Sequence, residues 1–344
     1  MKTKLIPLLL CLCLLASCGG QGGAPSPTPP ADSPDPTAAA SASPDSPAAS
    51  PEGPAPAEDT AITFTDDLGQ EFSMEAPERV VVMIGSFADV WVLAGGADTM
   101  AATANDAWES YGLELGEETA NIGSPMKPNG ELVLASEPDL IIASSLSPSN
   151  VELKETFNLA GIPAAYFDVS SFQDYLDLLD LFTRLTGHPE NYETYGAAVQ
   201  EQVDGAVERR AVYDYTPSVL TIQVSGSSVK VKNSEDNVLG PMLKELGCRN
   251  IADDDTSLLE DLSLEAIIQA DPDYIFAVYH GTDEAAAQAN LEATLLSNPA
   301  WAGLSAVQAG RFHILERRMF SLKPNALWGD AYEKLADILC AGAE

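Results

Sequence analysis

Positive charge is scarce in this chain of 344 residues, which carries 17 lysines and arginines against 52 aspartates and glutamates. The formal net charge is −35 at pH 7. Proteins that bind nucleic acid need clustered cations to neutralise phosphates, so this composition argues against a nucleic-acid partner. An anionic small molecule is still compatible with the sequence, provided that some of the few cations gather at one site.

Histidine is also scarce, and the common catalytic sequence motifs are absent. The three histidines are His188, His280 and His313, whereas a dedicated site for zinc or manganese normally needs several converging nitrogen ligands. The chain contains no GxxxxGK phosphate loop, no GxSxG elbow and no HExxH pair. A Ser-His-Asp set could still assemble in space, but we expect a protein that is not an enzyme and has no metal site or intrinsic cofactor.

Cysteine usage leaves the redox state open. Three of the five cysteines lie within the first eighteen residues, and Cys248 and Cys340 remain. These two could pair in an oxidising compartment, although no spacing rule supports such a disulfide. Because Cys340 falls on the apolar side of the last predicted helix, the pattern favours a buried free thiol.

The start of the chain is typical of a secreted lipoprotein. A short basic segment precedes an apolar run from Leu5 to Ala16, which is too short to span a membrane. The run ends in LASC, and small residues before Cys18 resemble the lipobox of bacterial lipoproteins. We therefore expect a signal peptide at 1–17 and a lipid on Cys18 that anchors the protein to the outer side of the cell membrane. A plain cleaved signal is the alternative.

The segment that follows the predicted anchor has the composition of a tether. Residues 19–60 hold 11 of the 24 prolines and contain no aromatic residue, lysine or arginine. Such a segment cannot bury enough apolar surface to offset the conformational entropy of ordering it. We expect 18–60 to be a disordered tether that reaches on the order of 100 Å when extended, at about 3.1 Å per residue.

The remaining residues, 61–344, exceed the usual size of one core and predict two lobes. Short apolar runs alternate with helical patterns, which indicates an α/β architecture. The predicted strands are Val80–Ile84, Leu140–Ala143, Ala164–Phe167, Val219–Val224, Tyr274–Val278 and Phe312–Leu315. The predicted helices include Ala88–Leu93, Glu131–Glu137, Val151–Ala160 and Ala326–Leu339.

An internal repeat supports two similar lobes. Residues 129–144 read NGELVLASEPDLIIAS, and residues 263–278 read SLEAIIQADPDYIFAV. In each copy a glutamate, Glu131 or Glu265, stands seven residues before a Pro-Asp pair, and an apolar strand follows. Each copy therefore predicts a short helix that ends before proline, a turn and a buried strand.

One long helix is predicted between the lobes. The stretch Glu190–Arg210 is rich in Ala, Glu and Gln and has few turn signals. We therefore expect an N-terminal lobe at 61–187, a linking helix at 188–211 and a C-terminal lobe at 212–344. A single helix restricts hinge motion more than flexible strands would.

Three segments carry a family resemblance in their order and spacing. These are ITFTDDLGQEFSMEAPERVVVM at 62–83, NGELVLASEPDLIIAS at 129–144 and GIPAAYFD at 161–168. They resemble the D-x-x-G hairpin with its P-x-R-V strand, the N-x-E…PDLI segment and the G-I-P-V strand of class III periplasmic binding proteins. That family serves ABC importers of siderophores, haem and cobalamin.

The resemblance implies two Rossmann-like α/β lobes, a ligand cleft between them and modest closure on binding. It implies delivery of a chelated metal, most simply a ferric siderophore, to a permease dimer with its ATPase. Haem, cobalamin, or a surface relay that never meets a permease are the alternatives. The family's docking glutamates match Glu131 and Glu265, although each could also be an exposed carboxylate that only favours its helix dipole.

Ligands of open α/β sheets bind beyond the carboxyl ends of the strands, so the loops there are the candidate site. Trp108 and Tyr111 could stack on a flat ligand. Arg317 and Arg318 could hold anionic oxygens, and His280 could ligate haem iron or a metal. The full set of candidate ligand contacts is Ser86, Phe87, Trp108, Tyr111, Met126, Lys127, Ser145, Tyr279, His280, Arg317, Arg318, Met319 and Phe320.

Overall fold

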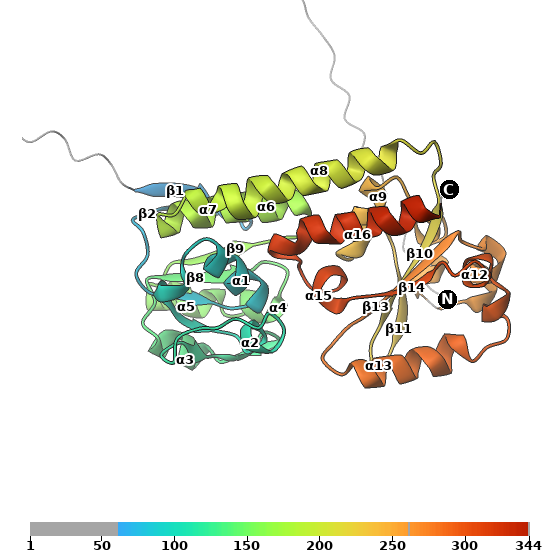
Figure 1. Ribbon diagram of the computed structural model, residues 1–344. Coiled ribbons are helices and arrows are strands. Elements are labelled where there is room, and N and C mark those ends of the chain that lie inside the picture. The colour runs from blue at the N-terminus through green and yellow to red at the C-terminus, as the bar shows by residue number, and fades with distance from the viewer. Residues whose placement is uncertain (1–60, 261, 343–344) are drawn as a thin grey trace, which may run out of the picture. The chain divides into compact units, whose positions relative to one another are not determined.

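The computed structural model describes residues 61–260 and 262–342. The predicted signal peptide, Cys18 and the tether therefore lie outside the described residues. The described chain forms two lobes, each a mainly parallel sheet with helices packed around it (Figure 1), which confirms the predicted α/β fold class. None of the described helices is both long and apolar enough to cross a membrane.

The N-terminal lobe has a five-stranded parallel sheet in the order β5-β4-β3-β8-β9. Strands β3, β8 and β9 are buried along their whole length, because helices cover both faces of a parallel sheet. The strands of this lobe are β1 (Ile62–Thr65), β2 (Glu71–Met74), β3 (Val80–Val82), β4 (Met100–Thr103), β5 (Ala120–Asn121), β6 (Gly123–Ser124), β7 (Lys127–Pro128), β8 (Leu140–Ser144) and β9 (Ala164–Phe167). Its helices are α1 (Gly85–Leu93), α2 (Asp106–Glu109), α3 (Gly130–Ala135), α4 (Pro148–Val151), α5 (Lys154–Ala160) and α6 (Phe172–Thr186).

The C-terminal lobe has a sheet in the order β11-β10-β13-β14, with β12 also paired to β10. Only β11 runs antiparallel, in a hairpin with β10. Its strands are β10 (Ser218–Val224), β11 (Val229–Lys232), β12 (Arg249–Asn250), β13 (Tyr274–Tyr279) and β14 (Phe312–Leu315). Its helices are α9 (Leu239–Glu245), α10 (Ile251–Asp254), α11 (Ser257–Glu260), α12 (Leu264–Ala270), α13 (Glu284–Leu291), α14 (Ser305–Gln308), α15 (Arg317–Phe320) and α16 (Trp328–Ala341).

The internal repeat forms the same unit in both lobes, as α3 followed by β8 and α12 followed by β13. The side chains of Asn129 and Ser263 cap the two helices by accepting backbone N–H bonds. Glu137 and Asp271, which precede the prolines, have φ angles of 48° and 40°. Proline excludes the right-handed helical conformation from the preceding residue, so each helix ends at this point.

The aspartate after each proline also has the same function in both copies. Asp139 accepts hydrogen bonds from the backbone N–H groups of Glu78 and Arg79, at 2.7 and 3.1 Å, just before β3. Asp273 accepts one from the backbone N–H of Ser218 at 2.8 Å, where β10 begins. Each lobe therefore fixes the start of a central strand with an equivalent carboxylate.

The linking helix runs continuously from Glu190 to Ala211, as α7 (Glu190–Tyr192), a π-helical turn (Glu193–Ala197) and α8 (Ala198–Ala211). The π-helical turn was not predicted. Gly196 lies in it, close enough to Tyr192 that a Cβ would be 2.9 Å from the ring. Helix α16 packs along α8 (Figure 1), so the linking helix is supported along its side.

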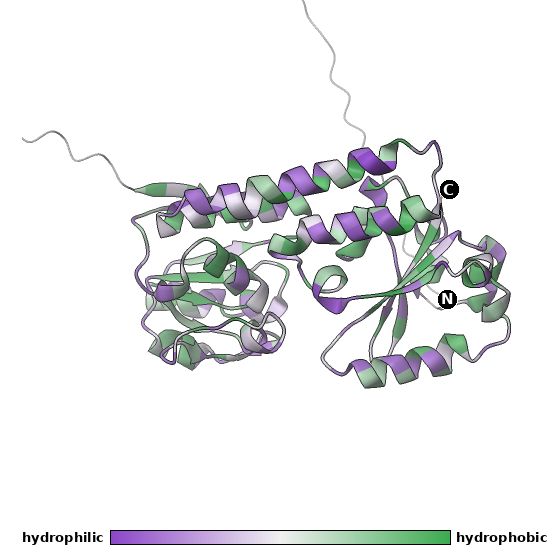
Figure 2. Cartoon of the chain, viewed as in Figure 1, coloured by the Kyte–Doolittle hydropathy of each residue, from purple (hydrophilic) through white to green (hydrophobic). Residues whose placement is uncertain are grey.

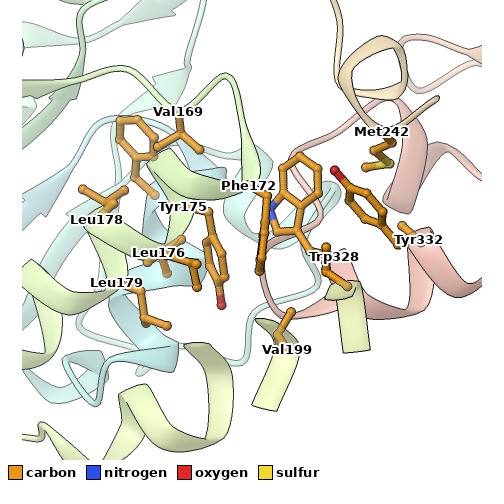
Figure 3. Close-up of a cluster of buried hydrophobic side chains, with 14 of the residues drawn as sticks. Val169, Phe172, Tyr175, Leu176, Leu178, Leu179, Val199, Met242, Trp328 and Tyr332 are labelled. Carbon is orange, nitrogen blue, oxygen red and sulfur yellow. The ribbon is translucent and has the colours of Figure 1, made fainter. Parts of the chain in front are cut away.

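The lobes share one hydrophobic core as well as a helix. This core extends from the strands of the N-terminal lobe to α9, α16 and one face of the C-terminal sheet. Phe172 of α6 lies at the junction, with its ring centre 5.7 Å from that of Trp328 and 6.5 Å from that of Tyr332 (Figure 3). In contrast to this apolar core, the linking helix α8 carries many hydrophilic residues, as Figure 2 shows. Packing therefore joins the lobes directly.

Both cysteines of the folded part are free thiols. Cys248 is buried, and this burial raises the pKa of its thiol to about 12. Cys340 is only half-buried on α16, whereas the sequence favoured a buried position. A thiol that stays protonated is a poor nucleophile, so Cys248 acts as a small apolar side chain.

Candidate ligand-binding site

Loops at the carboxyl ends of strands in the two lobes contact each other. The segment after β14 in the C-terminal lobe reaches α1, which follows β3, and the loop after α2, which follows β4. Arg317 Nη2 donates to Ser110 Oγ at 3.3 Å, and Asn325 Nδ2 donates to the carbonyl oxygen of Ser86 at 2.9 Å. This meeting of strand ends is where ligands of α/β folds bind.

The first group of side chains here is the interlobe cluster, defined as Asp89, Tyr111, Arg318 and Asn325. Arg318 Nη2 donates to Asp89 Oδ2 at 2.8 Å, and Asn325 Nδ2 donates to the same oxygen at 2.8 Å. The guanidinium carbon of Arg318 lies 4.5 Å from the ring centre of Tyr111, a cation–π contact. The cluster connects α1 to the segment that precedes α16.

Asp89 and Asn325 of the interlobe cluster are buried, whereas Tyr111 and Arg318 are half-buried. Burial raises the pKa of the Asp89 carboxyl, although hydrogen bonds from Asn325 and Arg318 act in the opposite direction. Burial also raises the pKa of the Tyr111 phenol, opposed by the charge of Arg318. Loss of Arg318 would leave the Asp89 carboxylate buried without its charged partner, which is destabilising.

The second group is the cationic cluster, defined as Lys232, His280 and Arg317. His280 Nδ1 lies 3.3 Å from Ser321 Oγ and 3.3 Å from Gln223 Nε2. Burial and the nearby charges of Arg317 and Lys232 lower the pKa of the His280 imidazole. Within the described part of the chain, Arg317 and Lys232 form no ion pair, and Arg317 Nε is buried without a hydrogen-bond partner.

A pocket of about 190 Å³ adjoins the cationic cluster. Gln223 and Ser321, which contact His280, line it together with Lys232 and Phe320. The pocket thus combines an apolar wall with hydrogen-bond donors and a cation, the usual composition of a small-molecule site. Asp236 also lines it, but its Oδ2 accepts a hydrogen bond from Asn233 Nδ2 at 2.8 Å.

A second pocket, of about 230 Å³, has the opposite charge. It lies by the β1–β2 hairpin and α6, and four aspartates line it with Arg184 as the cation. An anionic ligand would be repelled there. In the described ranges, no group of at least three His, Cys, Asp or Glu side chains is arranged to hold a metal ion. The cationic cluster and its pocket are therefore the better candidate site.

The structure disperses the predicted contacts of the N-terminal lobe. Ser86 and Phe87 are buried within α1, and Ser145 is half-buried after β8. Trp108 packs partly against the core, and Tyr111 belongs to the interlobe cluster. Two further predicted contacts, Met126 and Lys127, are exposed near the turn of the β6–β7 hairpin, and Met126 has an exposed fraction of 78%.

The predicted contacts of the C-terminal lobe lie closer together. Tyr279 is half-buried at the end of β13, next to His280, and Met319 packs partly against the core. Phe320 is buried but lines the pocket. The structure separates Arg317, in the cationic cluster, from Arg318, in the interlobe cluster. Sequence reasoning missed five residues of these groups, namely Asp89, Gln223, Lys232, Ser321 and Asn325.

The two repeated glutamates, Glu131 and Glu265, are exposed in the first turns of α3 and α12. Each helix leads back through a short turn into a central parallel strand, so its N-terminus lies at the carboxyl edge of the sheet. Both carboxylates therefore stand at the rim where the loops of their own lobe gather. Neither forms an ion pair among the described residues.

Comparisons with known proteins agree with this architecture. A family model described as "Periplasmic binding protein" matches residues 80–318. YhfQ of Bacillus subtilis (strain 168), provisionally named an ABC transporter substrate-binding lipoprotein, is 23% identical over 292 residues, which cover 80% of this chain and 87% of that protein.

Solved structures show the same fold. The periplasmic heme-binding protein RhuT from Roseiflexus sp. RS-1, in its apo form, has a TM-score of 0.63 at 21% identity and covers 78% of this chain and 99% of its own. The petrobactin-binding protein YclQ from Bacillus subtilis has a TM-score of 0.62 at 16% identity and covers 83% of this chain and 99% of its own. The chain therefore belongs to the periplasmic binding proteins of class III, the substrate-binding proteins of ABC importers for siderophores, haem and cobalamin.

Proposed function

We propose that this protein binds an anionic ferric siderophore at the cationic cluster and delivers it to an ABC permease. The cationic cluster carries the proposal, because three basic side chains lie near one another and form no ion pair within the described residues, in a chain of net charge −35. Ferric chelates with catecholate or carboxylate groups present anionic oxygens, which arginine and lysine bind by charge-assisted hydrogen bonds. YclQ, which shares the fold, is a petrobactin-binding protein.

Arg317 and Lys232 of the cationic cluster are not occupied by ion pairs within the described residues. Arg317 makes one weak contact, to Ser110 at 3.3 Å, and its Nε has no partner within the described residues. An unsatisfied buried donor costs free energy, which an anionic ligand would recover by accepting from it. A metal that arrives already chelated needs no ligand set from the protein.

Haem is a second candidate, and His280 is the observation that favours it. Burial and the charges of Arg317 and Lys232 lower the pKa of this imidazole, which favours its neutral form, and a neutral imidazole can ligate iron. RhuT, which shares the fold, is a heme-binding protein. Substitution of Arg317 and of His280 therefore distinguishes the two ligands.

Delivery and anchoring complete the proposed function. Cys18 would hold the protein at the membrane through a lipid, as the name of the similar lipoprotein YhfQ suggests for that protein. Glu131 and Glu265, one on each lobe, would bind basic residues of the permease dimer. These exposed carboxylates need no rearrangement of the fold to reach a partner.

A thermal-shift screen of ferric siderophores, haem and cobalamin tests the ligand. A ligand at 100 times its Kd adds about 2.7 kcal/mol to the free energy of unfolding, which corresponds to a rise of roughly 5–10 °C in Tm. We expect the shift with an anionic ferric siderophore and expect Arg317→Gln to weaken its binding by about 10- to 100-fold, because a hydrogen bond to a charged group is lost.

Arg209→Gln is the matched control, because Arg209 pairs with Asp337 on exposed helices away from the cluster. It should leave the siderophore affinity unchanged. A shift with haem that His280→Gln abolishes would replace the siderophore by haem. No shift with any of the three ligand classes would refute the proposal.

Binding of an anionic chelate should also depend on pH through His280. The pKa of this imidazole is lowered in the free protein by burial and by Arg317 and Lys232, and a bound anion would raise it again. Affinity should therefore increase as pH falls through the pKa of the complex, and level off below the pKa of the free protein. Titrations between about pH 5 and 8 would measure this.

The ligand itself can titrate, so the comparison is between the native protein and His280→Gln with the same siderophore. The variant should lose the part of the pH dependence that His280 contributes. Identical pH profiles would show that no anionic group of the ligand lies near His280.

A further inference from the structure

Arg317 and Arg318 are neighbours with different surroundings. Besides its bond to Asp89, Arg318 donates from Nη1 to the carbonyl oxygens of Lys323 and Pro324, at 2.9 and 3.0 Å, and it stacks on Tyr111. Its donors are thus used within the chain, whereas Arg317 retains a buried Nε without a partner in the described residues. The two cations therefore have separate functions.

No side-chain hydrogen bond within the described part of the N-terminal lobe explains why Asp89 lies in α1. It is the only charged residue of α1, and Phe87, Val90 and Trp91 around it are buried. Both side-chain hydrogen bonds that it makes within the described chain come from the C-terminal lobe, from Arg318 and Asn325. A carboxylate placed among apolar residues is retained here by contacts across the lobes.

Asn325 shows that the contact is built into the backbone. It is fully buried and has a φ angle of 55°, a left-handed conformation that is unfavourable unless the surroundings support it. Its Nδ2 supplies that support by bonding to Ser86 and Asp89. Nearby, the Lys323 ammonium donates to the carbonyl oxygen of Val169 in the N-terminal lobe.

We infer that Asp89, Arg318 and Asn325 form a clasp that holds the two lobes together, and that Asp89 positions the ligand-binding residues through Arg318. Arg317 and Ser321 lie in the same segment as Arg318, between β14 and Asn325. Release of the clasp frees this segment and moves Arg317 and Ser321 away from His280. The strength of the clasp therefore sets how often the site opens, whatever chelate it binds.

Hydrogen exchange of the full chain without ligand, followed by mass spectrometry, tests the clasp. Asp89→Asn and Arg318→Gln should each speed amide exchange by at least roughly tenfold in residues 85–93 of one lobe and 317–327 of the other, because a buried charged contact is lost. The double variant should exchange no faster than the stronger single variant, since both act on one interaction. Arg318→Lys keeps the positive charge beside Asp89 but loses the planar guanidinium group, so it should speed amide exchange less in the same segments.

Asp337→Asn is the matched control, because Asp337 forms an exposed ion pair with Arg209 between α8 and α16. Its exchange pattern should match that of the native protein. The clasp is refuted if Arg318→Gln and Arg318→Lys change exchange only around residue 318, or if the effects of Asp89→Asn and Arg318→Gln add. Since no ligand is present, the result is independent of the siderophore proposal.

Discussion

Reversal of charge at both Glu131 and Glu265 is expected to abolish uptake of the chelate while its affinity for the binding protein stays within about twofold of the native value. Both carboxylates are exposed and make no ion pair in the described chain. Placing arginines there would oppose the basic residues proposed on the permease, and like charges across an interface cost several kcal/mol. Uptake of radioactive iron by cells that carry the importer, alongside titration of the purified protein, measures both quantities.

The chain offers closely matched controls for this experiment. Glu201 and Glu208 are also exposed glutamates, but they lie on the linking helix α8 and not in a helix that begins at the carboxyl edge of a sheet. Glu201→Arg with Glu208→Arg changes the net charge equally and should leave uptake intact. Normal uptake by the Glu131→Arg and Glu265→Arg double variant would show that these carboxylates do not dock, and would favour a surface relay that meets no permease.

Phe172→Ala is expected to lower the free energy of unfolding by about 3–5 kcal/mol, the usual cost of removing a buried aromatic ring. Phe172 is 7% exposed and contacts Tyr175 on its own helix as well as Trp328 and Tyr332 on α16 (Figure 3). Its loss removes packing on both sides of the junction. Denaturant unfolding, followed by far-UV circular dichroism and by tryptophan fluorescence, measures the change.

Trp301→Ala is the comparison variant, because it removes a buried aromatic ring from one lobe and not from the junction of the two. Trp301 packs against Phe312 within the C-terminal lobe alone. Phe172→Ala should keep the two optical probes coincident, since the shared core unfolds as one unit. A loss below about 1 kcal/mol for Phe172→Ala would contradict the assignment of a common core, because such a value is typical of a surface site.

Sequence patterns located the central strands because burial on both faces leaves a continuous apolar run. The prediction Leu140–Ala143 differs from β8 by one residue, and Ala164–Phe167 coincides with β9. Strand β11 was missed. Its sequence, VKVK, has two lysines among four residues, and so short a polar strand has no pattern that separates it from a loop.

The candidate site was harder to predict from the sequence than the strands were. Asp89 and Arg318 are 229 positions apart, and no periodicity connects residues at such a separation. Arg317 and Arg318 look equivalent in the sequence because they are adjacent and both basic, and only the fold shows that Arg318 forms an ion pair with Asp89 whereas Arg317 forms none within the described residues. A lone carboxylate inside an apolar helix was a usable signal for Asp89, because an unpaired buried charge is rare.

The repeat, in contrast, was readable because its physical causes are local. Proline fixes where each helix ends, and the capping side chain fixes where it begins. Both act over fewer than ten residues, as the matched angles at Glu137 and Asp271 show. Contacts within one unit therefore leave a sequence signature, whereas contacts between lobes do not.

The continuous core has a mechanical consequence for transport. Independent lobes that are joined only by a hinge can move apart by thermal motion. Lobes that share Phe172, Trp328 and Tyr332 cannot separate widely, because separation would expose aromatic surface to water. The two lobes are therefore held rigidly, and ligand binding alone changes their arrangement little. If the protein docks on an importer as proposed, the free energy that separates the lobes has to come from that importer, because thermal motion of the binding protein does not supply it.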